Sequence, residues 1–284
     1  MRAVSVRAPG ALNDLSIIQQ ALPILKNDEC LIKVAYTAVN RADILQRKGA
    51  YPPPKGESET IGLEAAGTIV NADEKGIWKT GDRVMALLGG GGYAEYARVK
   101  SGHIMRIPKN LKMNEAAAIP EVFLTAFQLI YFVSDLKQRD VDHSKLSFLV
   151  HAGASGVGTA LIQILNKVIK SDNIFVTVGS DSKKRYLNET FNLKENYLVN
   201  YKTEDFQSRI LSETNNRGVD FVFDCVGSSY WQKNLDSLAI DGNWILYGTL
   251  SGGAVNGDML SKLLRKRIQL RSSTLRARSN EVIL

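Results

Sequence analysis

One stretch of the sequence, residues 146–158 (LSFLVHAGASGVG), constrains the fold more than any other. Its mostly apolar start, Leu146–Val150, is typical of a strand buried on both faces of a parallel sheet. The glycine turn at residues 153–158 follows, and then apolar residues recur at helical spacing over Thr159–Val168. This order suits the pyrophosphate of a dinucleotide, because a tight turn lets the backbone approach and the helix N-terminus offers free N–H groups. The stretch therefore predicts a dinucleotide site, although Ala152 and Gly153 stand where G-x-G is more common.

Length and composition set the class of protein. A chain of 284 residues suggests about two domains, and 44% apolar with 23% charged residues is ordinary for a folded protein. There is no apolar run of about 18 residues and no signal peptide, so we expect a cytoplasmic protein without a membrane span. Cys30 and Cys225 lie in strand-like runs and favour buried, reduced thiols. The net charge of +7 is dispersed, and densest at Lys262–Arg278, which favours a solvated surface over RNA binding.

The rhythm of the chain changes near Pro120. Before it, short strands broken by turns predict an irregular β-barrel. After it, helices alternate with buried strands, which predicts a doubly wound parallel sheet and an α/β fold overall. We expect domains at residues 1–120 and 121–272 and a return segment at 273–284. The expected strands are Ala3–Val6, Glu29–Ala38, Ala65–Val70, Arg83–Leu87, Tyr93–Val99, His103–Ile107, Leu146–Val150, Asn173–Gly179, Tyr197–Asn200, Gly218–Cys225, Asn243–Gly248 and Lys266–Ser272; the expected helices are Asn114–Ala118, Val122–Val133, Thr159–Val168, Lys183–Phe191, Glu204–Thr214 and Tyr230–Ala239.

Several motifs carry a family resemblance. They are AVNRADILQRKGA at Ala38–Ala50 followed by YPPP, GLEAAG at Gly62–Gly67, GDRV at Gly81–Val84, AAAIP at Ala116–Pro120, DCVG at Asp224–Gly227, SYW at Ser229–Trp231 and YG at Tyr247–Gly248. With these the chain resembles the zinc-free quinone oxidoreductase branch of the medium-chain dehydrogenase/reductases, most of all the tumour-suppressor-inducible members from animals. The resemblance implies a GroES-like catalytic domain, a Rossmann domain that binds NADPH, and reduction of quinones in the cleft between them. It also implies a homodimer formed through the outer strand of the Rossmann sheet.

Residue types argue against a metal site. Zinc members of the superfamily need a cysteine near position 40 and a histidine before the glutamate of GLE, where this chain has Asn40 and Leu63. A structural zinc lobe needs four closely spaced cysteines, and this chain has two cysteines, far apart. We therefore expect no metal, and Glu64 is more simply a buried carboxylate tied to backbone or to an arginine.

Two candidate catalytic residues follow from the resemblance. Asn40 and Tyr51 would line the cleft beside the nicotinamide and hydrogen-bond a quinone oxygen. Tyr51 could equally be a turn residue packed on Pro52–Pro54, and Asn40 a structural amide. Thr125 would contact the nicotinamide or ribose, or bond back to a helix carbonyl. Because a quinone is already electrophilic, its reduction needs donor and acceptor held face to face more than it needs a strong acid or nucleophile.

The charges after the second Rossmann strand indicate which dinucleotide binds. NAD enzymes place a carboxylate at the end of this strand, whereas here it ends in Gly-Ser at residues 179–180. Lys183 suits a 2′-phosphate, although Asp181 could face the ribose instead. A charged helix start is the other explanation for the cations at 183–185, but the helix dipole disfavours it. In the family, a lysine and a tyrosine hold the phosphate, and Lys183 and Tyr201 match them. The expected NADPH-binding residues are Thr125, Ala154, Ser155, Gly156, Val157, Gly158, Gly179, Ser180, Lys183, Tyr201, Tyr247 and Gly248.

The C-terminal region departs from the family pattern. Relatives run further and cross back to the catalytic domain, whereas this sequence ends at Leu284, shortly after a basic segment at 274–278 that in relatives approaches the cofactor's phosphates. Two alternatives therefore stay open. One is a non-catalytic NADPH-binding protein, either a truncated isoform or an RNA-binding relative. The other is a reductase of the double bond in 2-alkenals or enoyl thioesters. The physiological acceptor, and whether electrons pass singly or in pairs, leave no residue signature.

Overall fold

The computed structural model describes residues 1–6, 15–74 and 76–278 of the chain. They form two compact units, and each is described by itself. The first comprises residues 1–124 together with the segment that starts at Leu275, and the second comprises Thr125–Thr274. The first unit is thus built from two parts of the sequence separated by the whole of the second.

The first unit is an antiparallel β structure. Its larger sheet has the strand order β6-β3-β4-β5-β7, and β1 and β2 pair in a separate two-stranded sheet. Apolar side chains of the larger sheet, with Ile32, Ile69 and Val84 among them, form its core. The strands are β1 (Arg2–Val6), β2 (Leu15–Gln19), β3 (Glu29–Tyr36), β4 (Glu64–Asn71), β5 (Arg83–Leu87), β6 (Tyr96–Lys100) and β7 (Ile104–Arg106), and the helices are α1 (Arg41–Arg47), α2 (Met113–Ala116) and the start of α3 (Pro120–Gln128).

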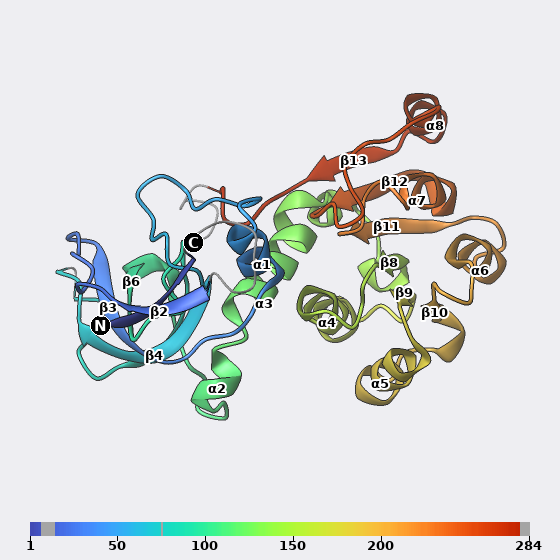
Figure 1. Cartoon of the computed structure of the whole chain (residues 1–284). Coiled ribbons are helices and arrows are strands. Elements are labelled where there is room, and N and C mark those ends of the chain that lie inside the picture. Colours follow the sequence, from blue (N-terminus) through green and yellow to red (C-terminus); the bar gives the residue numbers. More distant parts are fainter. Residues whose placement is uncertain (7–14, 75, 279–284) are drawn as a thin grey trace. The chain divides into compact units, whose positions relative to one another are not determined.

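The second unit is a six-stranded parallel sheet with the order β10-β9-β8-β11-β12-β13. In order along the chain this is 3-2-1-4-5-6, the doubly wound arrangement. Figure 1 shows α4 and α5 on one face of the sheet and α6, α7 and α8 on the other. The strands are β8 (Phe148–Val150), β9 (Ile174–Val178), β10 (Leu198–Asn200), β11 (Val219–Asp224), β12 (Leu238–Leu246) and β13 (Gln269–Ser272), and the helices are α4 (Gly156–Gln163), α5 (Asp181–Phe191), α6 (Phe206–Glu213), α7 (Trp231–Ser237) and α8 (Met259–Lys266).

The structure confirms the predicted α/β fold and corrects some elements. Helix α8 was not predicted, and residues 266–268, expected in the last strand, lie at its end and in the turn after it. Its apolar residues are only half used for packing, because Met259 and Leu263 face the core while Leu260 and Leu264 stay exposed. Leu238 and Ala239, expected to end a helix, begin β12 instead, since Leu238 pairs with Val219 of β11. Strand β2 and helix α1 were also not predicted.

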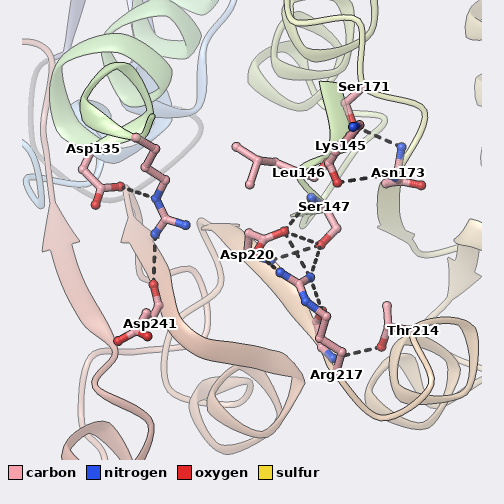
Figure 2. A network of polar contacts seen from close by, with 12 residues as sticks. Asp135, Lys145, Leu146, Ser147, Ser171, Asn173, Thr214, Arg217, Asp220 and Asp241 are labelled. Atoms are coloured by element: carbon pink, nitrogen blue, oxygen red, sulfur yellow. Dashed lines mark hydrogen bonds and ion pairs between the residues drawn. The ribbon is translucent and has the colours of Figure 1, made fainter. Parts of the chain in front are cut away.

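A polar cluster fixes the amino end of the central strand (Figure 2). One carboxylate oxygen of Asp220, in β11, accepts hydrogen bonds of 2.8 Å from both the backbone N–H and the hydroxyl of Ser147. Arg217 donates to the other oxygen at 2.5 Å. Burial alone would raise the pKa of Asp220, but the bonds from Arg217 and Ser147 outweigh it and lower the pKa. The cluster therefore anchors β8 at one end, while the glycine turn occupies the other.

Candidate functional site

The glycine turn after β8 is packed too tightly for side chains. A Cβ on Gly153 would lie 1.9 Å from Cγ1 of Val176 in β9, and one on Gly158 would lie 2.5 Å from the carbonyl oxygen of Ala152. Ala152 itself has φ of +51°, a conformation that side chains rarely adopt. The turn thus brings the start of α4 against the sheet, as the close approach of a pyrophosphate requires.

The start of α4 is ordered by its own N-cap. Ser155 is the N-cap residue, and its hydroxyl accepts a 3.1 Å hydrogen bond from the N–H of Gly158. Ser155 and Gly156 are exposed, so the first turn of the helix is open to an anion. These residues fit the diphosphate of a dinucleotide, with Ala154 and Val157 completing the turn.

The end of β9 forms the second part of this site. A Cβ on Gly179 would lie 2.8 Å from the hydroxyl oxygen of Tyr201, so the absence of a side chain makes room for that phenol. Ser180 caps α5, and its hydroxyl accepts from the N–H of Lys183 at 3.4 Å. Tyr201 is 46% exposed, and the exposed Lys183 forms no ion pair within the described part of the chain. The Tyr201 hydroxyl and the Ser180 hydroxyl thus lie at the end of β9, and Lys183 follows in the first turn of α5.

Residues 247 and 248 follow β12 at the same edge of the sheet. The N–H of Tyr247 donates to the carbonyl of Asp224 at 2.8 Å. A Cβ on Gly248 would lie 3.1 Å from the carbonyl oxygen of Cys225. Burial raises the pKa of the Cys225 thiol to about 11, so this cysteine stays protonated and unreactive.

A buried chain of hydrogen bonds lies beneath these strand ends. Nδ1 of His151 is 2.9 Å from the hydroxyl of Thr177, and Nε2 is 2.7 Å from Oδ1 of Asn234. Asn234 donates its amide to Asp224 at 3.0 Å, as does the indole N–H of Trp244. Because Oδ1 of Asn234 must then accept, Nε2 of His151 carries the proton. Burial lowers the pKa of His151 and keeps the ring neutral. The chain connects the ends of β8, β9, β11 and β12 with α7.

In the first unit, Asn40 lies in a cluster of carboxylates. Its side-chain amide donates to Glu64 at 2.6 Å, and the other oxygen of Glu64 accepts the backbone N–H of Glu121 at 2.9 Å. Asp43 accepts from the backbone N–H of Asn40 at 2.7 Å and from the hydroxyl of Tyr93 at 3.0 Å. Burial, followed by the charges of Glu64 and Asp43, raises the pKa of Glu121 to about 8. Glu121 is therefore mostly protonated at neutral pH.

Arg276 supplies the positive charge of this cluster. Its guanidinium donates to the carbonyl of Gly89 and to the side-chain oxygen of Gln46, each at 3.0 Å, and lies 5.4 Å from the ring centroid of Tyr51. Burial lowers the pKa of Arg276, and the neighbouring phenol and carboxylates oppose that shift. Arg276 and Glu121 both line a cavity of about 210 Å³. The basic segment at 274–278 thus places one arginine inside the first unit.

The structure gathers the predicted residues in two groups. Ala154–Gly158, Gly179, Ser180, Lys183, Tyr201, Tyr247 and Gly248 lie at the carboxyl ends of the parallel strands, and Asn40 and Tyr51 lie in the first unit. Thr125 is buried within α3, in the second unit. Sequence reasoning missed Glu121 and Arg276 as members of the acidic cluster. The pairing of Asn40 with Glu64 was also missed, although Glu64 was expected to be tied to backbone.

The described residues contain no group of three or more histidine, cysteine, aspartate or glutamate side chains placed to hold a metal ion. None of the helices in the described ranges is both long and apolar enough to cross a membrane. Both cysteines, Cys30 and Cys225, are free and buried.

Comparison with known proteins matches both units. Residues 26–109 match the alcohol dehydrogenase GroES-like domain, and residues 156–283 match the zinc-binding dehydrogenase family. The human synaptic vesicle membrane protein VAT-1 homolog-like is 30% identical over 92% of this chain and 59% of its own length. Escherichia coli quinone oxidoreductase complexed with NADPH superposes with a TM-score of 0.84 at 25% identity, over 100% of this chain and 84% of that one. The JamJ enoyl reductase superposes with a TM-score of 0.82 at 25% identity, over 99% of this chain and 84% of that one.

The curated relatives are longer proteins, and this chain spans 9% of one of the first and 59% of another. A GroES-like unit joined to a doubly wound sheet with an open glycine turn defines a dinucleotide-dependent oxidoreductase fold. The chain belongs to the medium-chain dehydrogenase/reductases, in their quinone oxidoreductase-like branch.

Proposed function

We propose that the protein is an NADPH-dependent oxidoreductase that reduces quinones without a metal. The observation that carries the proposal is the end of β9, where the Tyr201 hydroxyl packs against Gly179 and the strand tip has no carboxylate. Ser180 caps α5 there, and Lys183 lies exposed in the first turn of that helix. This arrangement suits a 2′-phosphate and leaves no acid at the strand tip to bind the 2′-hydroxyl of NAD. The NADPH bound to the Escherichia coli relative supports the same choice.

The residues of the first unit suit a neutral, electrophilic acceptor. NADPH supplies a hydride when bound, and a quinone that takes the hydride and one proton becomes a hydroquinone. Asn40 keeps one amide hydrogen on Glu64 and has a second to offer a substrate oxygen. Burial, with a smaller contribution from Glu121, raises the pKa of Tyr51, so the phenol stays protonated and can donate. At the positions where zinc relatives need cysteine and histidine the chain has Asn40 and Leu63, and no step of this reaction needs a Lewis acid.

The test measures NADPH consumption by its absorbance, with and without an ortho-quinone, for the wild-type chain and for Asn40→Ala and Tyr51→Phe. Quinone-dependent turnover that prefers NADPH and falls in either variant is expected. NADPH binding without turnover would instead favour a non-catalytic NADPH-binding protein. Failure to bind NADPH would overturn the proposal.

Reduction of a carbon–carbon double bond is the second candidate, because JamJ is an enoyl reductase of the same fold. The same assay with a 2-alkenal and an enoyl thioester separates the two. A kcat/KM for either compound above that for the quinone would assign the protein to double-bond reduction.

A homodimer through the edge of the parallel sheet is also part of the proposal. Strand β13 pairs with β12 on one side and with no described strand on the other. Next to it in sequence, Leu260 and Leu264 of α8 are 80% and 79% exposed. A free strand edge and an apolar stripe together suit a second copy of the chain. The two free, buried cysteines support a reducing compartment such as the cytoplasm.

A further inference from the structure

Asn200 links the end of β10 to Asp181, beside the proposed position of the 2′-phosphate. It is the last residue of β10, next to Tyr201 in sequence, and is 4% exposed. Its Oδ1 accepts the backbone N–H of Lys202 at 3.3 Å, and its Nδ2 donates to Oδ1 of Asp181 at 2.9 Å. The first bond fixes which end of the amide carries oxygen, so the donor must point at Asp181.

Asn200 contacts a second carboxylate as well. Its backbone N–H donates to Oε1 of Glu204 at 3.2 Å. Glu204 also pairs with Lys184 at 2.9 Å and with Arg209 at 2.7 Å. Burial alone would raise the pKa of Glu204, but these partners outweigh it and lower the pKa, so the side chain is a neutralised anion. Asp181 and Glu204, the two acids near the ends of β9 and β10, are thus both hydrogen-bonded to Asn200, and Glu204 also pairs with two cations.

Asp181 is the acid that could oppose NADPH. It directly follows Ser180, its side chain is exposed, and it is the first carboxylate after the tip of β9. Turned toward Ser180 and Lys183, it would repel a 2′-phosphate and offer an acceptor to a 2′-hydroxyl instead. When Asp181 is bonded to Asn200, its carboxylate does not pair with Lys183. Among the described residues, Lys183 then has no ion pair and is available to a phosphate.

We propose that Asn200 is a specificity-determining residue that selects NADPH over NADH by holding Asp181 against the end of β10. Asn200 acts through Asp181 and is a positioning residue, because its own side chain is buried and bonded. This inference rests on the proposed NADPH binding and adds the device that sets the choice of dinucleotide.

The test is a double-mutant cycle between Asn200→Ala and Asp181→Asn, read by calorimetric binding of 2′,5′-ADP and of 5′-AMP. These fragments differ only in the 2′-phosphate and need no turnover. Asn200→Ala should weaken the binding of 2′,5′-ADP about tenfold and change the affinity for 5′-AMP by less than about twofold. In the Asp181→Asn background, where the side chain carries no charge, the same substitution should change 2′,5′-ADP binding less than about threefold.

Asn196→Ala is the matched control, because Asn196 also donates to a carboxylate, that of Glu213, without contacting Asp181. It should leave both affinities unchanged. An equal loss of both ligands in Asn200→Ala, or a loss of 2′,5′-ADP binding that persists with Asp181→Asn, would overturn the role of Asn200. Should Asn200→Ala fail to fold, Asn200→Ser takes its place in the cycle, with the same expected pattern. A wild-type chain that binds neither fragment would overturn the proposed cofactor itself.

Discussion

The backbone N–H of Glu121 donates a 2.9 Å hydrogen bond to the carboxylate of Glu64, so two acidic residues share one buried corner of the first unit. Burial is the larger cause and the charge of Glu64 the next, and together they raise the pKa of Glu121 from 4.5 to about 8. In the unfolded chain this carboxyl ionises near its ordinary value, so between these two values the folded state holds a proton that the unfolded state has lost.

The first prediction concerns this linked proton. The free energy of unfolding should fall as the pH rises from about 5 to 8, by up to about 1 kcal/mol per pH unit, reduced by the partial exposure of the side chain. Glu121→Gln should flatten this dependence, because the amide does not titrate. Denaturant unfolding at several pH values checks it, with the exposed Glu189→Gln as control. Parallel curves for wild type and Glu121→Gln would contradict the prediction.

Removing the Lys183 cation from the first turn of α5 should change the choice of cofactor. Lys183→Ala should weaken NADPH by about ten- to a hundredfold and leave NADH nearly unchanged, because only NADPH carries the 2′-phosphate. Arg185→Ala is the matched control, since residue 185 is rotated by about 200° around α5. Fluorescence titration of both dinucleotides measures the effect. If the ratio of the affinities for NADPH and NADH were unaltered in Lys183→Ala, Lys183 would have no part in the choice of cofactor.

Adding one methyl group to the glycine turn should destabilise the second unit. The new Cβ of Gly153→Ala would lie 1.9 Å from Cγ1 of Val176, so the turn and β9 must separate. We expect a loss of about 1–3 kcal/mol in the free energy of unfolding and weaker dinucleotide binding. Gly253→Ala is the control, because the nearest heavy atom to its Cβ lies at 3.9 Å. Wild-type stability in Gly153→Ala would contradict the packing.

The cluster at the amino end of β8 should be needed for stability and not for chemistry. Asp220→Ala leaves the Ser147 backbone N–H and hydroxyl buried without their acceptor, so unfolding should become easier by about 2–3 kcal/mol. The exposed Asp172→Ala should change stability by less than about 0.5 kcal/mol. Thermal unfolding compares the two. Turnover per folded molecule should stay the same, and a specific loss of kcat would place Asp220 in the reaction instead.

The exposed leucines of α8 should control the oligomeric state. Replacing Leu260 and Leu264 together by glutamate should convert a dimer to a monomer, because two charges would enter the apolar contact. Light scattering after gel filtration reads the mass directly. Val168→Glu is the control, because it also places a charge on an exposed apolar residue, at the end of the helical segment that follows α4. It should leave the dimer intact. A monomeric wild-type chain would remove the dimer from the proposed function.

The architecture was predictable because its signals are local. A fully buried strand such as β8 appears in the sequence as a continuous apolar run, and the turn that follows it is marked by its glycines. Helix α8 was missed although its apolar residues, at 259, 260, 263 and 264, recur at helical spacing, because its lysines and arginines were assigned to a basic surface cluster. Asp181 illustrates a limit of a different kind: the sequence shows a carboxylate near the phosphate position, but only the fold shows that Asn200, nineteen residues away, holds it.

Arg276 reaches Gly89 across 187 residues of sequence, and Leu275 beside it is buried in the same unit. A ribosome therefore makes most of the first unit early but can complete its acidic corner only after the entire parallel sheet has been synthesised. Until then Glu121 and Asp43 lack the nearby positive charge of Arg276, which lowers the pKa of both side chains, so the nascent first unit should open more readily than the finished one. No single cut of the chain separates the two units without removing that arginine from the acidic side chains whose pKa values it lowers.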